Sequence, residues 1–219
     1  MKIDTLGSDT RRSAAPLVQI VDDDQSVRLA LADLLESADF TVRCFESGHA
    51  FLDAGMPDRA SCVLLDMRLK EVNGLDVQAS MRARRCEIPI IFMTGYGTIP
   101  MTVQAMKGGA VEFLTKPIAD DVLLQAVRNA LAIDTARLEA QAIDADLRLR
   151  FESLTPRERE VMALAVGGLM NKQLAAELGT SEITAKVHKR HVMEKMSARS
   201  LADLVLAAEK LGIEAAKRR

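Results

Sequence analysis

The N-terminal part of the chain alternates short apolar runs with longer segments of helical periodicity, from Leu17 to about Ala130. The runs are brief, apolar and mostly β-branched, which is typical of strands covered on both faces. This pattern predicts five strands, at Leu17–Val21, Thr41–Phe45, Cys62–Leu65, Pro89–Met93 and Val111–Leu114.

The segments between these runs have the spacing of amphipathic helices. In the first of them, Val27, Leu31, Leu34 and Leu35 recur on one helix face. Five successive βα units predict a parallel sheet with helices on both faces. A barrel would need eight such units, so we expect a doubly wound, flavodoxin-like α/β domain with the strand order 2-1-3-4-5. Its helices are expected near residues 24–37, 47–54, 73–84, 98–108 and 119–132.

Residues 130–152 contain no Gly or Pro and are rich in Ala, Leu, Glu and Arg. This composition favours helix throughout, so we expect the last helix of the α/β domain to continue as a stiff linker over residues 133–152. Its apolar positions leave two alternatives open, a plain spacer and a coil that pairs with a second copy of the chain.

Residues 153–219 have the pattern of four short helices and no strand. Thr155, Pro156 and Glu158 form a capping box with Pro at the first helical position, which marks a helix start. Further helices are expected from Asn171 to Leu178, from a Ser181 cap to about Met196, and from a cap formed by Ser200 with Asp203. The chain is thus predicted to hold an arm at residues 1–16, an α/β domain at 17–132, a linker at 133–152 and an all-α four-helix domain at 153–219.

Composition and charge narrow the class of protein. The chain of 219 residues is 48% hydrophobic and 27% charged, with a net charge of −2, which is typical of a soluble globular protein. It contains no apolar run of the ~18 residues that suggest a membrane span. Residues 1–16 have no hydrophobic signal core and are expected to be a disordered arm, so we expect a cytoplasmic protein without a membrane partner. The three cysteines, Cys44, Cys62 and Cys86, are expected to be buried free thiols.

The charge is unevenly distributed. Residues 153–219 carry 12 Lys and Arg against 8 Asp and Glu, a net charge of +4, and the rest of the chain has a net charge of −6. An acidic first part and a basic second part fit a metal or phosphoryl site followed by a module that binds nucleic acid.

Polar residues gather where the predicted strands end. Asp22, Asp23 and Asp24 follow the first strand, Asp66 ends the third, Thr94 ends the fourth and Lys116 follows the fifth. Open α/β sheets place their sites at these carboxyl ends. Converging carboxylates repel one another unless a cation lies between them, and hard oxygen ligands suit Mg²⁺. A hydroxyl and an ammonium at the same point suit a phosphoryl group.

The segments VDDD (21–24), LLDMRL (64–69), FMTGYGT (92–98) and FLTKP (113–117) resemble the signature of bacterial receiver domains over residues 17–130. The resemblance implies that Asp66 accepts a phosphoryl group. It also implies that Asp22, Asp23, Asp66 and the backbone carbonyl of Arg68 hold Mg²⁺, with Asp23 as the more direct ligand. Thr94 and Lys116 would contact the phosphoryl oxygens, Phe113 would be the buried switch aromatic and Lys116–Pro117 a cis peptide. Asp24 is expected to cap the first helix.

The second and third helices of the C-terminal domain have the features of a helix-turn-helix. Ala175 allows close approach, Gly179 permits a tight turn, and Leu174, Leu178 and Val187 are expected to pack the two helices together. The third helix then presents a basic outer face that can enter a DNA major groove.

Residues 154–205 resemble the LuxR-type helix-turn-helix of FixJ-like regulators. By this match Lys186, Val187 and Arg190 would contact base edges, and the phosphate contacts would come from Thr184, Asn171, Lys172, Lys189 and Lys195. Ala185 stands where the family more often has Val, which removes packing volume. For His188, a phosphate contact and a structural role stay equally open.

Taken together, the two resemblances predict a response regulator, not an enzyme. A sensor histidine kinase would phosphorylate Asp66, and the protein would bind double-stranded DNA as a homodimer, with RNA polymerase as a further candidate partner. One alternative is a phosphatase of the haloacid-dehalogenase type, because Asp22 and Asp24 mimic its DxD motif, followed by Thr94 and Lys116. The central Asp66 and the attached helix-turn-helix argue against it. The other alternative is an output domain that binds RNA or protein, but no stacking aromatic residue accompanies the basic helix.

Overall fold

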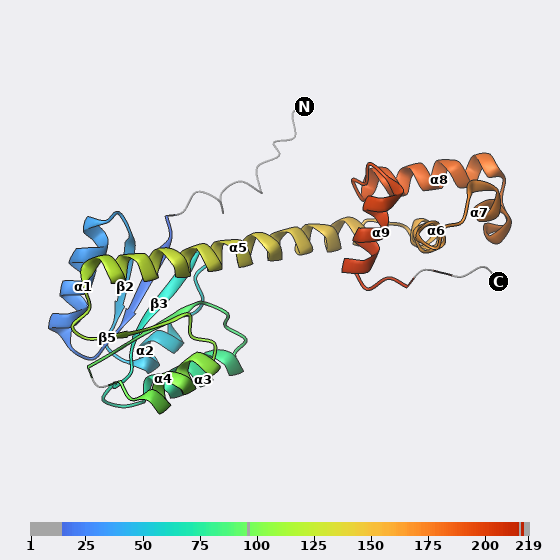
Figure 1. The fold of residues 1–219 in the computed structure, drawn as a ribbon. Coiled ribbons are helices and arrows are strands. Elements are labelled where there is room, and N and C mark those ends of the chain that lie inside the picture. The colour runs from blue at the N-terminus through green and yellow to red at the C-terminus, as the bar shows by residue number, and fades with distance from the viewer. Residues whose placement is uncertain (1–14, 96, 215, 217–219) are drawn as a thin grey trace. The chain divides into compact units, whose positions relative to one another are not determined.

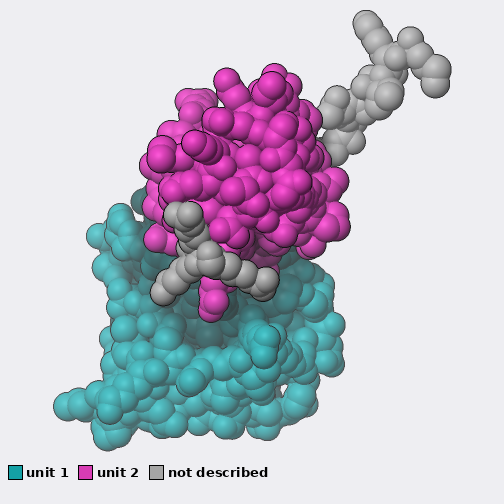
Figure 2. Space-filling view, turned by 90° about the vertical axis from the view of Figure 1, so that its right-hand side faces the viewer, with its two compact units in different colours: residues 1–138 teal, residues 139–219 magenta. Residues whose placement is uncertain are grey.

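The chain divides into two compact units, residues 1–138 and 139–219 (Figure 2), in a computed structural model that describes residues 15–95, 97–214 and 216. The arm expected at residues 1–16 therefore lies, apart from Ala15 and Pro16, outside the described residues. None of the described helices combines the length and the apolar composition that crossing a bilayer requires.

The first unit contains a parallel five-stranded sheet in the order β2-β1-β3-β4-β5, as the sequence predicts. β1 and β2 have the predicted bounds, whereas β3, β4 and β5 each end one residue later than predicted, which brings Asp66, Thr94 and Thr115 into the strands. The strands are β1 (Leu17–Val21), β2 (Thr41–Phe45), β3 (Ser61–Asp66), β4 (Ile90–Thr94) and β5 (Glu112–Thr115).

Helices cover both faces of this sheet (Figure 1). On one face, α1 and α5 pack Leu35, Leu123 and Val127 against the side chains of β1 and β3. On the other face, α2, α3 and α4 contribute Phe51, Val77, Met81 and Ala105 to a second apolar cluster. The helices are α1 (Gln25–Ser37), α2 (Gly48–Asp53), α3 (Gly74–Ala83), α4 (Ile99–Lys107) and α5 (Asp120–Glu152).

The helix α5 is continuous over 33 residues, so the predicted linker segment is helical throughout. Its side chains contribute to both cores. Leu131 packs in the first unit, where the buried Asp134 accepts a hydrogen bond from the backbone N–H of Ser61 at 2.8 Å. Near its other end, Leu147 and Phe151 pack against the core of the second unit.

The described part of the second unit contains helices joined by short turns, and no strand. After the end of α5, its helices are α6 (Pro156–Val166), α7 (Asn171–Leu178), α8 (Glu182–Lys195) and α9 (Leu201–Lys210). The capping boxes predicted at Thr155 and Ser200 are present, and Ser181 caps α8. Gly179 ends α7 with a φ of 61°, a backbone conformation that glycine adopts without steric cost. The turn that joins α7 to α8 is therefore the one the sequence predicts.

Three expectations about burial are corrected. Cys62 is buried, but Cys44 is exposed and Cys86 is half-buried, because β2 lies at the edge of the sheet and Cys86 lies in the loop before β4. Val187 does not pack α7 against α8, since its side chain is exposed on the outer surface of α8 and Ala185 and Val192 fill the core instead. Phe113 is half-buried rather than buried.

Candidate functional site

The residues predicted to form the receiver site meet at one edge of the sheet. Asp66 and Thr94 are the last residues of β3 and β4, Asp22 and Asp23 follow β1, and Lys116 follows β5. Because all five strands are parallel, their carboxyl ends lie at the same edge, and the register pairs Asp66 with Met93 and Thr94 with Thr115. The topology alone therefore brings together residues up to 94 positions apart in the chain.

Lys116 joins the two most buried carboxylates of this edge. Its Nζ lies 2.7 Å from Asp22 Oδ2 and 2.7 Å from Asp66 Oδ1. The remaining carboxylate oxygens accept backbone N–H groups, from Asp24 to Asp22 Oδ1 at 2.9 Å and from Arg68 to Asp66 Oδ2 at 2.6 Å. A single ammonium thus faces two carboxylates, so these three charged groups together carry one excess negative charge.

Burial and this ion pair set the protonation of the site. Burial raises the pKa of Asp66, and the hydrogen bond and charge of Lys116 offset only part of that increase. Burial lowers the pKa of Lys116, but its hydrogen bonds with Asp22 and Asp66 outweigh burial, so its pKa lies above the ordinary value. Lys116 therefore stays charged at neutral pH and can bind the oxygens of an anion that reaches Asp66.

Asp23 completes the oxygen-rich side of the site. Its carboxylate is half-buried and lies 3.4 Å from the ammonium of the exposed Lys70. Carboxylates and a backbone carbonyl are the donors that Mg²⁺ prefers, and the excess negative charge favours a divalent cation. In the described arrangement, however, no group of three or more His, Cys, Asp or Glu residues is disposed to hold a metal ion, since Lys116 occupies the space between Asp22 and Asp66.

The loop after β4 passes over the two expected switch residues. Thr94 is almost fully buried, and the ring of Phe113 lies 6.3 Å from that of Phe92. A Cβ added at Gly97 would lie 3.0 Å from the Phe113 ring and 3.2 Å from the Thr94 methyl group. Glycine at 97 therefore lets the backbone pass closely over both side chains. The sequence alone does not single out Gly97, although this glycine lies within the FMTGYGT segment.

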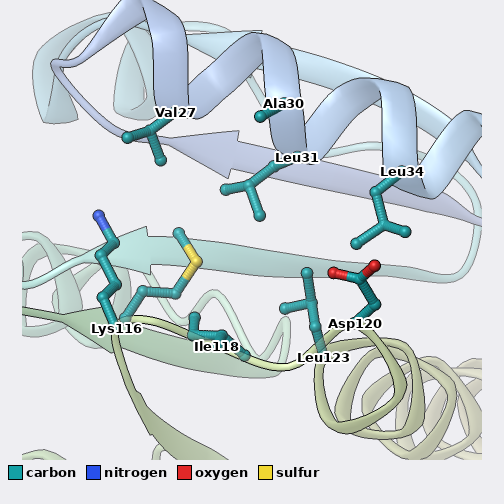
Figure 3. A pocket seen from close by; sticks show the side chains of 9 residues that line it. Val27, Ala30, Leu31, Leu34, Lys116, Ile118, Asp120 and Leu123 are labelled. Carbon is teal, nitrogen blue, oxygen red and sulfur yellow. The ribbon is translucent and has the colours of Figure 1, made fainter.

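A cavity of about 330 Å³ lies beside this site (Figure 3). Leu31 and Leu34 of α1 and Leu123 of α5 line it, with Lys116 at one end and Asp120 at the other. Lys116 is thus accessible from the side of α1 while its ammonium reaches the carboxylates.

The second set of predicted residues lies on α7 and α8. On α8 the exposed residues are Thr184, Lys186, Val187 and Arg190, and Lys189 is half-buried. At the start of α7, Lys172 is exposed and its neighbour Asn171 is half-buried. Ile183 of α8 is also exposed, although it is not among the residues predicted from the sequence. Projection of α8 as a helix with Ala185 and Val192 inward would have found it, because Ile183 then lies on the opposite side.

Lys195 is engaged within the second unit. Its Nζ lies 2.6 Å from the buried carboxylate of Glu158 and donates to the carbonyl of Ser153 at 3.3 Å. Glu158 also accepts the Thr155 N–H at 2.8 Å as part of the capping box of α6. The hydrogen bond from Lys195 lowers the pKa of Glu158 to about 2. Lys195 therefore fixes the end of α8 against α6.

Comparison with known families assigns both units. Residues 18–128 match the response regulator receiver domain, and residues 152–208 match the bacterial regulatory proteins of the luxR family. These two matches include every residue singled out at the two sites.

Several characterised proteins are similar over nearly the whole chain. Nodulation protein W of Bradyrhizobium diazoefficiens is 51% identical over 209 residues, which cover 95% of this chain and 92% of that protein. The transcriptional regulatory protein FixJ of the same organism is 39% identical over 196 residues, or 90% of this chain and 96% of FixJ. Among solved structures, the response regulator StyR has a TM-score of 0.83 and 46% identity, covering 90% of this chain and all of that one. The chain therefore belongs to the FixJ-like response regulators, transcription regulators that join a receiver domain to a LuxR-type DNA-binding domain.

Proposed function

We propose that a sensor histidine kinase transfers a phosphoryl group to Asp66 and that the phosphorylated protein binds operator DNA as a homodimer. The observation that carries the first step is the Lys116 ammonium, which lies 2.7 Å from the carboxylates of both Asp22 and Asp66. A buried carboxylate held by a cation at the end of a parallel strand is suited to accept a phosphoryl group and to stabilise its charge.

In the proposed transfer, a carboxylate oxygen of Asp66 attacks the phosphorus of the kinase phosphohistidine. The new P–O bond forms an acyl phosphate, the P–N bond breaks, and the histidine ring leaves with the electron pair of that bond and takes a proton from solvent. Lys116 would move from the carboxylate of Asp66 to the phosphoryl oxygens, and the Thr94 hydroxyl would donate to another of them. Phe113, packed beneath Gly97, would follow the movement of Thr94.

Mg²⁺ is the proposed cofactor of this step. Asp23, Asp66 and the backbone carbonyl of Arg68 would hold it, with Asp22 as the second acidic residue. The ion would neutralise charge on the transferred group. Lys70, the exposed partner of Asp23 at 3.4 Å, would give way to the metal because a solvated ion pair contributes little stability.

The proposed DNA interface is the exposed side of α8 together with the start of α7. Lys186, Val187 and Arg190 would contact base edges, while Thr184, Lys189, Asn171 and Lys172 would contact phosphates. Lys195 is also predicted as a phosphate contact, but its main proposed role is to hold α8 against α6 through its ion pair with Glu158. RNA polymerase is a further candidate partner. The alternative of a phosphatase of the haloacid-dehalogenase type has no support, because the chain belongs to the response regulators.

Labelling with acetyl phosphate tests the phosphoryl step directly. The wild-type chain with Mg²⁺ should gain one phosphoryl group, detected by intact mass, and a chelator should abolish the gain. Asp66→Asn should remain unlabelled, Asp23→Asn should label more slowly and require more Mg²⁺, and the exposed Asp33→Asn control should behave as wild type. Labelling of Asp66→Asn at the wild-type rate, or labelling unaffected by a chelator, would contradict the proposal.

A further inference from the structure

The outer face of α8 is defined by the residues opposite its buried face. Ala185 and Val192 are fully buried in the core of the second unit. With 3.6 residues per turn, the positions about half a turn away from them are 183, 187, 190 and 194. They are occupied by Ile183, Val187, Arg190 and Glu194, and all four are exposed.

This face has two chemically different halves. At its N-terminal half, the side chains of Ile183 and Val187 lie one turn apart and are 78% and 39% exposed. At its C-terminal half, Arg190 Nε lies 3.4 Å from Glu194 Oε1. Two polar residues, Thr184 and Lys186, lie on opposite sides of the helix face formed by Ile183 and Val187.

Ile183 has a fixed position but no packing partner in the described cores. Ser181 Oγ accepts the backbone N–H of Thr184 at 3.1 Å, which holds the first turn of α8 in place. Ile183 is nevertheless absent from the apolar core of the second unit and from the residues packed against it. Burial of its side chain by a partner would therefore remove apolar surface from water without any rearrangement of the domain.

We propose that Ile183 and Val187 determine sequence specificity by contacting the C5 methyl groups of thymines in the major groove. This inference rests on the proposed DNA-binding function. The exposed basic side chains of Lys186 and Arg190, on the same helix as the apolar pair, direct this face towards the phosphate backbone. The thymine methyl is the apolar group that base pairs present in the major groove, so it is the feature that an exposed apolar pair on the entering helix can recognise.

Replacement of single thymines by uracil tests this proposal, because it removes only the methyl group. A duplex is first selected from a randomised pool by the full-length protein, and each thymine of one half-site is then replaced in turn. The wild type should lose about fourfold in affinity at one or more thymines, the value expected for one lost methyl contact. Ile183→Ala should bind the unmodified duplex about that much more weakly and should lose the uracil penalty at one of these positions.

Matched variants separate this contact from other effects. Val187→Ala should lose the penalty at a different thymine, whereas Ile143→Ala, which truncates another exposed isoleucine on α5, should keep all wild-type penalties. All variants should have the wild-type melting temperature. Selected half-sites without thymine, or wild-type uracil penalties throughout in Ile183→Ala, would overturn the inference. Failure to enrich any duplex, with or without phosphodonor, would instead count against the proposed DNA-binding function.

Discussion

At the scale of single residues, the ion pair between Lys195 and Glu158 shows how one carboxylate can serve two elements. Glu158 closes the capping box of α6 and also accepts a 2.6 Å hydrogen bond from Lys195 near the end of α8. The position of α8 in the domain thus depends on a charged contact as well as on the apolar core. Loss of this contact should therefore lower the stability of the second unit, whereas the exposed side chains of α8 should keep their positions.

Glu158→Gln should lower the stability of the second unit by about 1 kcal/mol, because Gln keeps the capping box and can still accept a hydrogen bond from Lys195 but lacks the negative charge that pairs with the ammonium. The folded-state pKa of Glu158, about 2, is below the usual value of 4.5. Its contribution is therefore fully present above pH 4.5 and is lost as pH falls towards 2. Scanning calorimetry of the full chain should show the difference from wild type shrinking over this window.

The exposed Glu160→Gln on the same helix provides the control. It should leave the unfolding transition of the second unit within about 0.5 kcal/mol of wild type. An equal effect of the two substitutions would contradict the role assigned to the Lys195 contact.

Residue roles differ in how far the sequence could predict them. The positions of Asp22, Asp66, Thr94 and Lys116 followed from the ends of the strands, because a parallel sheet leaves them only one edge to share. The partner of Lys195 could not be predicted, since Glu158 is 37 residues away and only the packing of α6 against α8 brings them together. The expectation that Val187 packs α7 against α8 was wrong because its apolar character favoured the core, whereas its exposure leaves the predicted base contact possible.

At the scale of elements, the start of α3 approaches the end of β3 very closely. A Cβ at Gly74 would lie 2.6 Å from the Asp66 carbonyl and 3.0 Å from the ring of Phe92. No side chain larger than hydrogen fits without displacing the backbone that holds Asp66. The glycine therefore positions the site although it carries no functional group.

Gly74→Ala should destabilise the first unit by about 1–3 kcal/mol, the usual cost of overpacking a filled interior. It should also slow phosphorylation by acetyl phosphate, because the Asp66 backbone has to shift. Gly95→Ala is the matched control, since no atom beyond its two chain neighbours lies within 4 Å of its added Cβ. Calorimetry and labelling rates measure both effects, and a Gly74→Ala protein indistinguishable from the control would contradict the close approach.

Helix α5 also depends on one buried residue for its position. Its fully buried Asp134 binds the Ser61 N–H at 2.8 Å and the Arg137 guanidinium at 2.8 Å. These contacts hold the continuing helix against the start of β3. The continuity of α5 was predictable from its lack of Gly and Pro, but its anchor was not, because an aspartate within a helical segment is usually solvated.

Asp134→Ala should destabilise the first unit by about 1–3 kcal/mol, since it leaves the buried Ser61 N–H without its acceptor. Arg137 keeps its ion pair with Glu87 at 3.7 Å. Asp146→Ala removes an exposed aspartate from the same helix, paired with Arg150, and should cost no more than about 1 kcal/mol. Chemical denaturation followed by circular dichroism compares them. Similar midpoints for the two variants would show that the buried contact does not anchor α5.

At the scale of the whole molecule, the two units have separate cores and separate sites, so the proposed function requires coupling between them. Phosphorylation would bias the arrangement around Thr94 and Phe113, and receiver pairing would bring two α8 helices to neighbouring half-sites. Affinity would then rise through effective concentration, without new contacts at each half-site.

The most direct test of this coupling is the affinity of the full chain for its selected duplex, measured at fixed salt with and without beryllofluoride as a phosphoryl mimic. The wild type should bind a two-half-site duplex more tightly when beryllofluoride and Mg²⁺ are present, and should bind a single half-site equally in both conditions. Asp66→Ala should match the unmodified wild type on both duplexes and gain nothing. A gain of the same size in Asp66→Ala, or a wild-type affinity that beryllofluoride leaves unchanged, would contradict control of DNA binding through Asp66.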